Sequence, residues 1–405
     1  MAARARVRLI ALLPGSVTQA SFCRMPTVNE SRLRAASVVA DARSVTREFI
    51  PGLELARLFY AETVRPRLDQ YFPGLPHTAA LIGAGSEVLG YDTARSTDHN
   101  WGPRLQVFLS SAAETQLSDS VHEVLTERLP AEFRGHPTVF AASGAEDQPP
   151  SHWITVAGLR HWLTETLGFD PTEPIGLLDW LATPTQVLAE ITGGAVFHDG
   201  LADESGGLEA ARANLTWYPH DVWLYVLACQ WQRIDQEEPF PGRCAEVGDD
   251  LGSAVVTARL VRDLMRLGLL MQRRYPPYSK WLGTALARSP AAPSFVPPLR
   301  ATAVAASWPE RERNLCEGYE AAARLHNALA LTPHLNPSVR PRFYDRPFRV
   351  LGAARFADAV RDQIQDDRVR ELPTVGAVDQ FIDSTDALTG DPAQLRAAVA
   401  ARLGI

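Results

Sequence analysis

The chain has 405 residues, which is too long for a single compact core, so the sequence predicts two domains and a small additional unit. Apolar residues make up 46% and charged residues 21%, as in an ordinary folded protein. The net charge of −7 opposes non-specific attraction to nucleic acid or to an acidic membrane surface, so neither is an expected partner.

The first 44 residues are expected to be a disordered leader that ends where the first helix starts. Basic residues precede a short apolar run at 9–13, which imitates a signal peptide. The run has about five residues, whereas a signal core needs roughly 7–15. Translation starts at Met1 or at Met25, and the sequence leaves this choice open.

Residues 45–205 are predicted to form an α+β domain with flanking helices. A helix over 41–72 precedes a strand at 77–82 and a turn of small residues at 83–86. A second strand is predicted at 105–109, followed by a helix at 115–129. The remaining elements are a candidate strand at 138–142, a loop at 144–151, a strand at 153–157, a helix at 159–166, a helix at 177–191 interrupted near Pro184, and a hairpin at 195–200.

After residue 206 the apolar period changes from 2 to 3.6, which predicts a helical domain over 206–350 and a tail unit over 351–405. A long helix should start at Asp249 or Asp250, which are good capping residues. Ser279 is expected to cap a helix that carries Lys280 and Trp281 in its first turn. The other predictions are helices at 208–215, 222–234, 308–331, 353–365 and 392–403, a loop at 290–298, and an irregular segment at 335–349.

The four cysteines are scattered along the chain. No pair has the spacing of a metal or redox site, which indicates free thiols in a reducing compartment. No run of about 18 apolar residues is present, so no membrane span is expected. We therefore expect a cytoplasmic protein.

Two short motifs could carry chemistry. Gly85 and Ser86 follow the first predicted strand, and Asp98, His99 and Asn100 precede the second. A glycine lets backbone N–H groups approach phosphate oxygens, and the serine hydroxyl adds a donor. On a strand, positions 98 and 100 point to the same face, where they could share Mg²⁺ with the phosphates of a nucleoside triphosphate (NTP).

These motifs resemble those of an uncharacterised bacterial domain-of-unknown-function family that is grouped with the nucleotidyltransferase fold. The likeness covers about residue 45 to the end, and it implies that the domain over 45–205 is a nucleotidyltransferase-like small mixed sheet with flanking helices. It is carried by residues 85–90, 96–104, 218–223, 242–244, 248–253, 275–283, 346–348 and 378–386.

The resemblance also exposes a departure. Nucleotidyltransferases tend to carry Asp-x-Asp, whereas this chain has asparagine at position 100. Asparagine offers a carbonyl oxygen but lacks the negative charge that a divalent cation favours. A third carboxylate is not evident, and Glu165 and Asp199 are only candidates. With Asp98, Asn100 and no evident third carboxylate, we expect the site to hold one weakly bound Mg²⁺ or none.

Lys280 is the only lysine in the chain. The resemblance implies that it reaches the triphosphate from the helical domain; the alternative is a helix-start lysine whose stem packs on Trp281. His99 is expected to make a structural hydrogen bond, and Glu87 and Asp92 are interpreted as solvated loop charges.

Three further sets of residues have mainly structural interpretations. Arg259, Arg262 and Arg266 form a helical stripe, for which a solvated face is favoured over an anion site. The polar segment 379–386 could line a cleft. An aromatic set is expected to be mostly core, although one member could stack on a base: Trp217, Tyr218, Trp223, Tyr225 and Trp231.

The leading functional hypothesis is a nucleotidyltransferase that moves a nucleoside monophosphate from an NTP to a hydroxyl of a small molecule or protein. Gly85 and Ser86 would hold the β- and γ-phosphates, Asp98 with Asn100 would hold Mg²⁺, and Lys280 would offset developing charge. The alternative is a catalytically weakened or inactive nucleotide-binding sensor or scaffold. A subset of the first hypothesis is an enzyme that modifies an aminoglycoside-type antibiotic. Acceptor, nucleotide preference and oligomeric state stay open.

Overall fold

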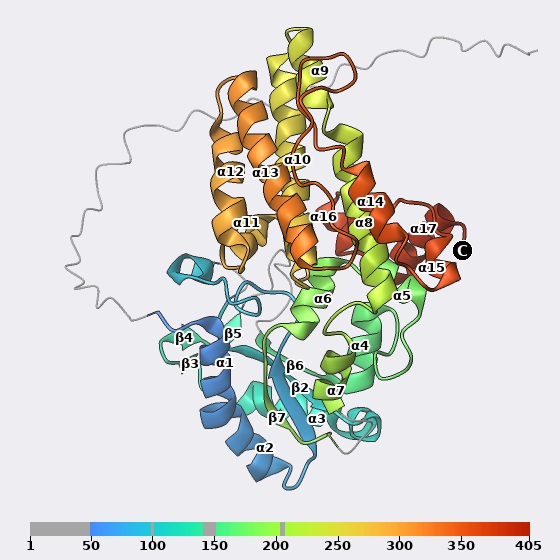
Figure 1. Cartoon of the computed structure of the whole chain (residues 1–405). Helices are drawn as coiled ribbons and strands as arrows, with labels where there is room; N and C mark the ends of the chain where they lie inside the picture. The colour runs from blue at the N-terminus through green and yellow to red at the C-terminus, as the bar shows by residue number, and fades with distance from the viewer. Residues whose placement is uncertain (1–48, 99–100, 141–150, 203–206) are drawn as a thin grey trace, which may run out of the picture. The chain divides into compact units, whose positions relative to one another are not determined.

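The computed structural model describes residues 49–98, 101–140, 151–202 and 207–405, apart from the side chain of Asp98. The predicted leader, His99, Asn100 and most of the predicted loop at 144–151 lie outside the described residues. The described residues form an α+β structure, with a small mixed sheet followed by a helical C-terminal region (Figure 1).

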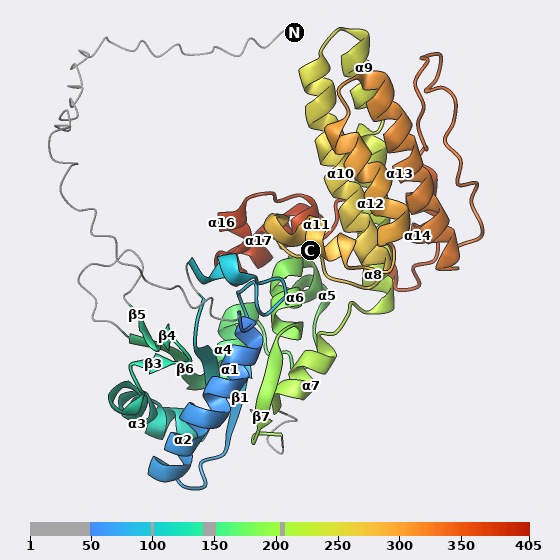
Figure 2. The same ribbon diagram turned by 90° about the vertical axis from the view of Figure 1, so that its left-hand side faces the viewer.

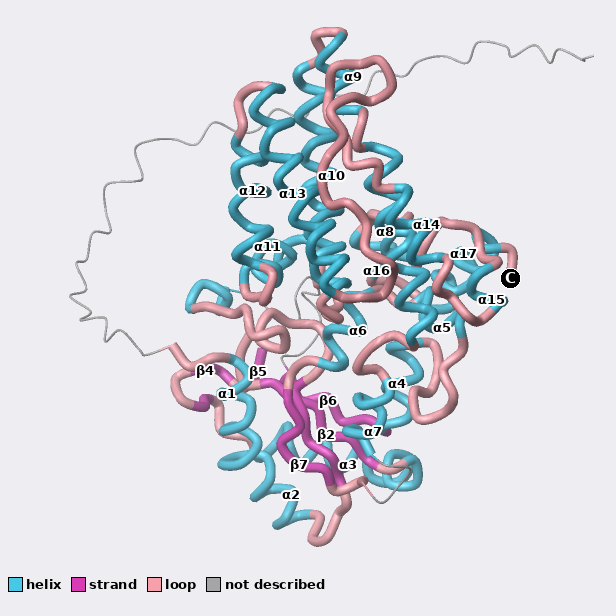
Figure 3. The backbone as a smooth tube through the Cα atoms, viewed as in Figure 1, coloured by secondary structure: helices cyan, strands magenta, loops and turns pink. Residues whose placement is uncertain are grey.

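The sheet has five strands in the order β5-β6-β2-β1-β7 (Figure 3). β1 is antiparallel to β2 and to β7, whereas β2 is parallel to β6. The strands at 77–82, 105–109 and 153–157 are confirmed, and the candidate at 138–142 is described as a two-residue strand. The bounds are β1 His77–Leu81, β2 Arg104–Leu109, β5 Val139–Phe140, β6 Ser151–Gly158 and β7 Ala195–Asp199, with a separate pair of β3 Glu132–Phe133 and β4 His136–Pro137.

The predicted hairpin at 195–200 is wrong in its pairing. β7 pairs with β1, more than a hundred residues earlier, so that Ala80 lies opposite Val196. The Asp199-Gly200 pair was a local turn signal, but the buried edge of β1 offers β7 a full ladder of hydrogen bonds.

The two faces of the sheet pack against different helices. Leu105, Val107 and Leu109 alternate along β2 and pack with helices α1 (Gly52–Phe59), α2 (Arg65–Tyr71) and α3 (Ser111–Arg128). Ala80 and Phe108 face the other way and join the cluster of α4 (Leu159–Leu167), α5 (Leu177–Ala182), α6 (Thr185–Thr192) and the later helices. This second face carries the cavity described below.

The first helix begins at Gly52, as the Pro51-Gly52 pair predicts, and residues 41–48 of the predicted range lie outside the described residues. A π-helical turn over Tyr60–Val64 separates α1 from α2. Pro66 lies two residues after this turn. Because proline lacks an N–H and crowds the carbonyl four residues earlier, it favours such a widened turn.

The later helices agree with the 3.6-residue period. α10 begins where predicted, and Asp249 caps it by accepting a 2.7 Å hydrogen bond from the N–H of Gly252. α12 and α13 lie side by side and also pack on α10 (Figure 2). Their bounds are α7 Gly207–Asn214, α8 His220–Glu237, α9 Phe240–Glu246, α10 Asp250–Met271, α11 Ser279–Ala287, α12 Ala292–Val304, α13 Trp308–Ala328, α14 Ala354–Arg361, α15 Asp367–Arg370, α16 Thr385–Leu388 and α17 Pro392–Leu403.

The predicted loop at 290–298 is wrong, because α12 occupies most of it despite prolines at 293, 297 and 298. Phe295 and Leu299 are buried against the neighbouring helices, and Phe295 lies against Gly268 of α10. Burial of these side chains compensates for the hydrogen bonds that proline removes.

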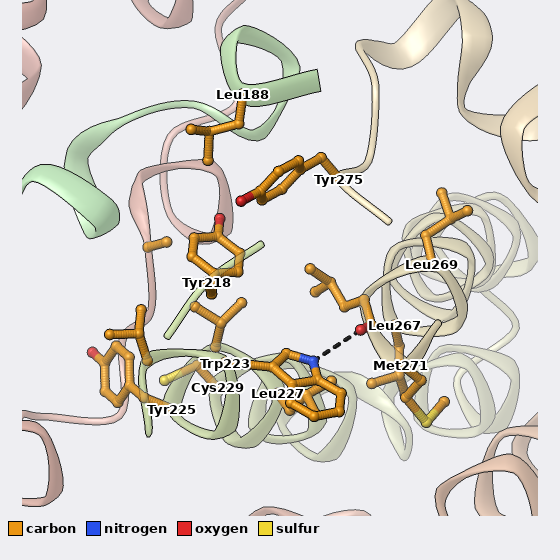
Figure 4. Packing of buried hydrophobic residues seen from close by; sticks show 14 of the residues in the cluster. Leu188, Tyr218, Trp223, Tyr225, Leu227, Cys229, Leu267, Leu269, Met271 and Tyr275 are labelled. Carbon is orange, nitrogen blue, oxygen red and sulfur yellow. Dashed lines mark hydrogen bonds between the residues drawn. The ribbon is translucent and has the colours of Figure 1, made fainter. Parts of the chain in front are cut away.

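The aromatic set is core, as predicted, with Tyr218, Trp223, Tyr225 and Trp231 buried and Trp217 partly buried. Trp223 donates a 2.9 Å hydrogen bond from Nε1 to the carbonyl oxygen of Leu270, which joins α8 to α10 (Figure 4). Within the described ranges, no helix combines the length and the apolar character that crossing a membrane would need.

Candidate functional site

A cavity of about 560 Å³ lies where β1 ends and where β2 and β6 begin. Gly85, Ser86 and Lys280 all line it, although they come from distant parts of the chain. The side chain of Asp98 and all of Asn100 lie outside the described residues, so the structure describes three of the five predicted site residues. Asp98 ends a 3-10 turn over Ala94–Asp98 and does not lie on a strand, because β2 starts only at Arg104.

The floor of the cavity is the parallel pair of β2 and β6. Arg104 lies opposite Trp153, and Gln106 lies opposite Thr155. All four residues line the cavity, and so do the intervening Leu105 and Ile154, because the cavity lies over the ends of the two strands. Gln106 accepts from the N–H of Ile82 at 3.1 Å and donates to its carbonyl at 3.0 Å. The side chain thus fixes the backbone just after β1, where the turn begins.

The turn at 83–86 needs a glycine at position 85. The φ angle of Gly85 is +154°, and a Cβ there would lie 2.1 Å from Nη2 of Arg104. Gly83 donates a 2.9 Å hydrogen bond to the carbonyl of Glu190, which ties the turn to α6. The hydroxyl of Ser86 has no hydrogen-bond partner among the described residues and is therefore available to a ligand.

Arg104 is held by two acceptors. It forms a 2.6 Å ion pair with Glu87 and donates a 2.6 Å hydrogen bond to the carbonyl of Ala84. Glu87 is only 2% exposed, so its interpretation as a solvated loop charge is wrong. The same correction applies to Asp92, which accepts from the N–H of Gly52 at 2.7 Å and from the indole of Trp101 at 3.1 Å. Loop polarity alone does not reveal which distant donors will pack on a carboxylate.

Lys280 is exposed at the rim of the cavity. Its Nζ lies 5.0 Å from the ring centroid of Trp281, a cation–π arrangement. Across the described part of the chain, no carboxylate lies within ion-pair distance of this ammonium. Tyr278, also in the cavity wall, accepts a 2.7 Å hydrogen bond from Trp281 and occupies the N-cap position that was predicted for Ser279. Ser279 is instead the first helical residue.

Helix α11 is attached to the turn that carries Ser86. Arg288 donates a 2.6 Å hydrogen bond to the carbonyl of Gly90, and its guanidinium lies 5.0 Å from the ring centroid of Tyr91. The rings of Tyr91 and Trp281 lie 5.5 Å apart. These contacts hold the helix of Lys280 against the turn of Ser86.

Part of the chain matches a known protein family. Residues 180–282 match a family described as a domain of unknown function, DUF4037. A DUF4037 domain is therefore present. Searches of curated proteins and of solved structures found no match. The DUF4037 domain contains Lys280, whereas the turn with Gly85 and Ser86 precedes it in the chain.

The described residues contain no group of three or more His, Cys, Asp or Glu side chains that could hold a metal ion. Glu87 is the only carboxylate among the described residues that line the cavity, and Arg104 engages it. Neither candidate for a third carboxylate lines this cavity. Glu165 pairs with His161 at 3.2 Å, and Asp199 accepts a 2.6 Å hydrogen bond from Thr78.

In the arginine stripe on α10 of the DUF4037 domain, Arg259 is exposed as predicted, whereas Arg262 and Arg266 are partly buried. Arg259 pairs with Glu237 and Arg262 pairs with Asp383, each at 2.6 Å. Arg266 donates to the carbonyl of Asp379, and burial lowers the pKa of its guanidinium. Arg262 and Arg266 therefore bind the polar segment 379–386, which also lines a small cavity of about 50 Å³.

Sequence reasoning missed Glu190 of the DUF4037 domain. This residue on α6 is 8% exposed, and its backbone carbonyl accepts from Gly83. Burial raises the pKa of its carboxyl to about 7, although Arg104 opposes the shift. No sequence signal could have indicated it, because only the tertiary fold brings α6 beside the turn.

Proposed function

We propose that this cavity binds the triphosphate of a nucleotide and that the protein is a nucleotidyltransferase. The observation that carries the proposal is that the Gly85-Ser86 turn and Lys280 line one cavity. The turn offers backbone N–H groups and a free hydroxyl, and Lys280 offers a compact ammonium without a carboxylate partner among the described residues. Such a set suits phosphate oxygens.

The charges of the cavity wall support an anionic ligand. Arg104 and Lys280 contribute two positive charges, and Glu87 contributes one negative charge among the described residues. Because Arg104 is fixed by Glu87 and Ala84, it does not have to reorganise when a phosphate arrives. Trp153 stacks on Phe140 with ring centroids 3.6 Å apart and gives the cavity an aromatic wall for a base.

The strand arrangement supports the nucleotidyltransferase-like fold that the motifs suggest. The Gly85-Ser86 turn connects β1 to the segment that leads into the antiparallel β2, and β2 runs parallel to β6. The Gly85-Ser86 turn therefore lies beside the first residues of two neighbouring strands, which supports its proposed role in phosphate binding. A pocket at that edge suits in-line transfer, which requires positioning and charge stabilisation more than covalent help from the protein.

In the proposed reaction an acceptor hydroxyl oxygen forms a bond to the α-phosphorus of the NTP. The bond from that phosphorus to the oxygen bridging the β-phosphate breaks, pyrophosphate leaves, and the hydroxyl proton passes to solvent. Lys280 would offset the charge that develops on the leaving phosphates. The side chains of Asp98 and Asn100, which were expected to hold Mg²⁺, lie outside the described residues. The carboxylate of Glu87 is engaged by Arg104. No step is therefore assigned to a metal.

The sole lysine permits a direct test. An acyl-phosphate derivative of ATP transfers its acyl group to an amine beside the bound phosphates, and Lys280 is the only side-chain amine in the chain. We expect acylation of Lys280 in mass spectra, its suppression by excess ATP, and weaker ATP binding in Lys280→Met by calorimetry. Arg300→Met, a loss of one exposed charge on α12 away from the cavity, is the matched control and should bind ATP as the wild type does. Labelling of Lys280 that ATP does not suppress would contradict the proposal.

A second candidate function is nucleotide binding without catalysis, in a sensor or scaffold. Asn100 favours it, because this residue replaces the second acid of the expected pair. Calorimetry with ATP, with and without Mg²⁺, and an assay for pyrophosphate separate the two functions. Tight binding that needs no metal and releases no pyrophosphate would leave only the second.

Antibiotic modification is a narrower form of the enzyme hypothesis. It predicts that overexpression of the wild-type protein protects cells from an aminoglycoside-type drug. Overexpression of the Lys280→Met variant should give no protection. Equal sensitivity of cells with and without the protein would remove this form and leave the general reaction standing.

A further inference from the structure

A second cavity, of about 400 Å³, lies beside the first. Helices α4, α5, α6, α16 and α17 surround it, and Ala84 belongs to the walls of both cavities. Its wall is mainly apolar, with Trp162, Leu167, Val187 and Leu395 among the lining residues. Such a wall suits a ligand that is itself mainly apolar.

One charged group in this wall has no charged or hydrogen-bonding partner among the described residues. Glu190 lines the second cavity, is 8% exposed, and forms no side-chain hydrogen bond or ion pair with any described residue. The other charged groups of the wall are engaged: Glu165 pairs with His161, and Asp179 pairs with Arg396. A buried carboxyl that lacks a partner is costly, and a donor supplied by a ligand would remove that cost.

We propose that the second cavity binds a mainly apolar molecule through an amino group that donates to the carboxylate of Glu190. The apolar wall takes the body of the ligand, and Glu190 takes its ammonium. The binding itself is independent of the nucleotide hypothesis. The two cavities meet at Ala84, and this position implies a further role: a hydroxyl of this ligand would be the acceptor of the transfer. That role rests on the proposed function.

A set of three probes tests the binding. Hexylamine, hexan-1-ol and hexanoate each have an unbranched chain of six carbon atoms and differ in the head group. Each is titrated by calorimetry into the full-length protein at pH 8. We expect hexylamine to bind most tightly and hexanoate least. Glu190→Gln, which keeps the shape of the side chain, should weaken hexylamine binding by about tenfold or more and leave hexan-1-ol within about twofold. Glu173→Gln, a loss of one exposed carboxylate outside both cavities, should leave all three affinities unchanged.

A second variant separates loss of binding from loss of folding. Ala393 is exposed at the start of α17 and lines the cavity, so Ala393→Trp should fill its mouth without disturbing the core. We expect this variant to lose the binding of all three probes while its circular dichroism spectrum stays that of the wild type. Equal affinity of hexylamine for the wild type and Glu190→Gln, no preference for the amine over the alcohol, or no detectable binding of any probe would each overturn the proposal.

An ATP titration of the wild-type protein keeps the two proposals apart. A wild-type protein that binds ATP but not hexylamine would contradict the amine site alone. A wild-type protein that binds hexylamine but not ATP would contradict the nucleotide site alone and remove the acceptor role, but it would leave the amine site standing.

Discussion

The carboxylate of Asp379 accepts a 2.8 Å hydrogen bond from the backbone N–H of Thr185, the first residue of α6. The hydroxyl of Thr185 lies 3.2 Å from the same carboxylate and 2.8 Å from the carbonyl oxygen of Pro276. One buried side chain from the C-terminal segment therefore holds the start of α6 and the segment that leads into α11. Helix α6 carries residues of the second cavity, and α11 carries Lys280 of the first.

We expect Asp379→Ala to lower the free energy of unfolding by about 2–4 kcal/mol, because it leaves the N–H of Thr185 and the guanidinium of Arg266 without their acceptor or counter-charge. Urea unfolding followed by circular dichroism measures this. Asp386→Ala removes an exposed carboxylate from the same segment and should change the free energy of unfolding by less than about 0.5 kcal/mol. Equal effects of the two substitutions would show that the hydrogen bond to Thr185 is not what stabilises the fold here.

Gly85→Ala is expected to destabilise the protein and to weaken ATP binding. The added Cβ would lie 2.1 Å from Nη2 of Arg104 and 2.9 Å from Oε2 of Glu87, so the buried ion pair would have to move. We expect a loss of about 2–4 kcal/mol in the free energy of unfolding. Gly283→Ala is the control: no atom lies within 4 Å of the added Cβ, and in the middle of α11 it should stabilise by about 0.5–1 kcal/mol. A Gly85→Ala protein as stable as the wild type would refute the close packing of this turn.

Arg288→Ala should weaken ATP binding more than it lowers stability. Without the hydrogen bond to Gly90 and the contact with Tyr91, Lys280 is no longer held against the turn of Ser86. We expect a loss of affinity of about threefold to tenfold, which corresponds to one hydrogen bond. We also expect faster hydrogen exchange at residues 86–91. Arg300→Ala, in an exposed position on α12, should change neither quantity. Faster exchange with unchanged ATP affinity would show that the contact is structural only.

Glu190 makes the stability of the fold depend on pH. Because burial raises the pKa of its carboxyl to about 7 from 4.5, the folded state holds the proton more tightly than the unfolded state. The contribution of the Glu190 carboxyl to the free energy of unfolding is fully present below about pH 4.5 and is lost as the pH rises through about 7. Arg104, which faces the carboxyl from β2, limits the shift without reversing it.

The corresponding prediction is that Glu190→Gln unfolds at a higher urea concentration than the wild type at pH 8 and at nearly the same concentration at pH 5. The gain at pH 8 should be about 1–3 kcal/mol. The pKa of Glu238 is also raised to about 7 by burial, but this group is present in both proteins, so the difference between them isolates Glu190. An equal difference at both pH values would contradict the raised pKa. A carboxylate kept at this cost to stability is what a ligand-binding role for Glu190 would require.

Short-range physics made much of the fold predictable from the sequence. The apolar residues of 105–109 predict a buried strand, Pro184 predicts the break between α5 and α6, and Asp249 predicts the start of α10. The Gly85-Ser86 motif and the lone lysine were also visible as candidates for one site. Each of these signals is local, because propensity, capping and side-chain alternation act within a few residues.

Only the tertiary structure decided the pairing of β7 with β1, the helix through the prolines of α12, and the burial of Glu87. It also decided that Glu190 lies beside the turn and that Asp379 holds α6. In each case the stabilising partner lies far away in the chain, and burial among distant residues outweighs the local preference. The sequence by itself determined which residue types were available for a phosphate pocket; long-range packing determined which of them meet, because a charge or a hydrogen bond acts only on what the fold brings within reach.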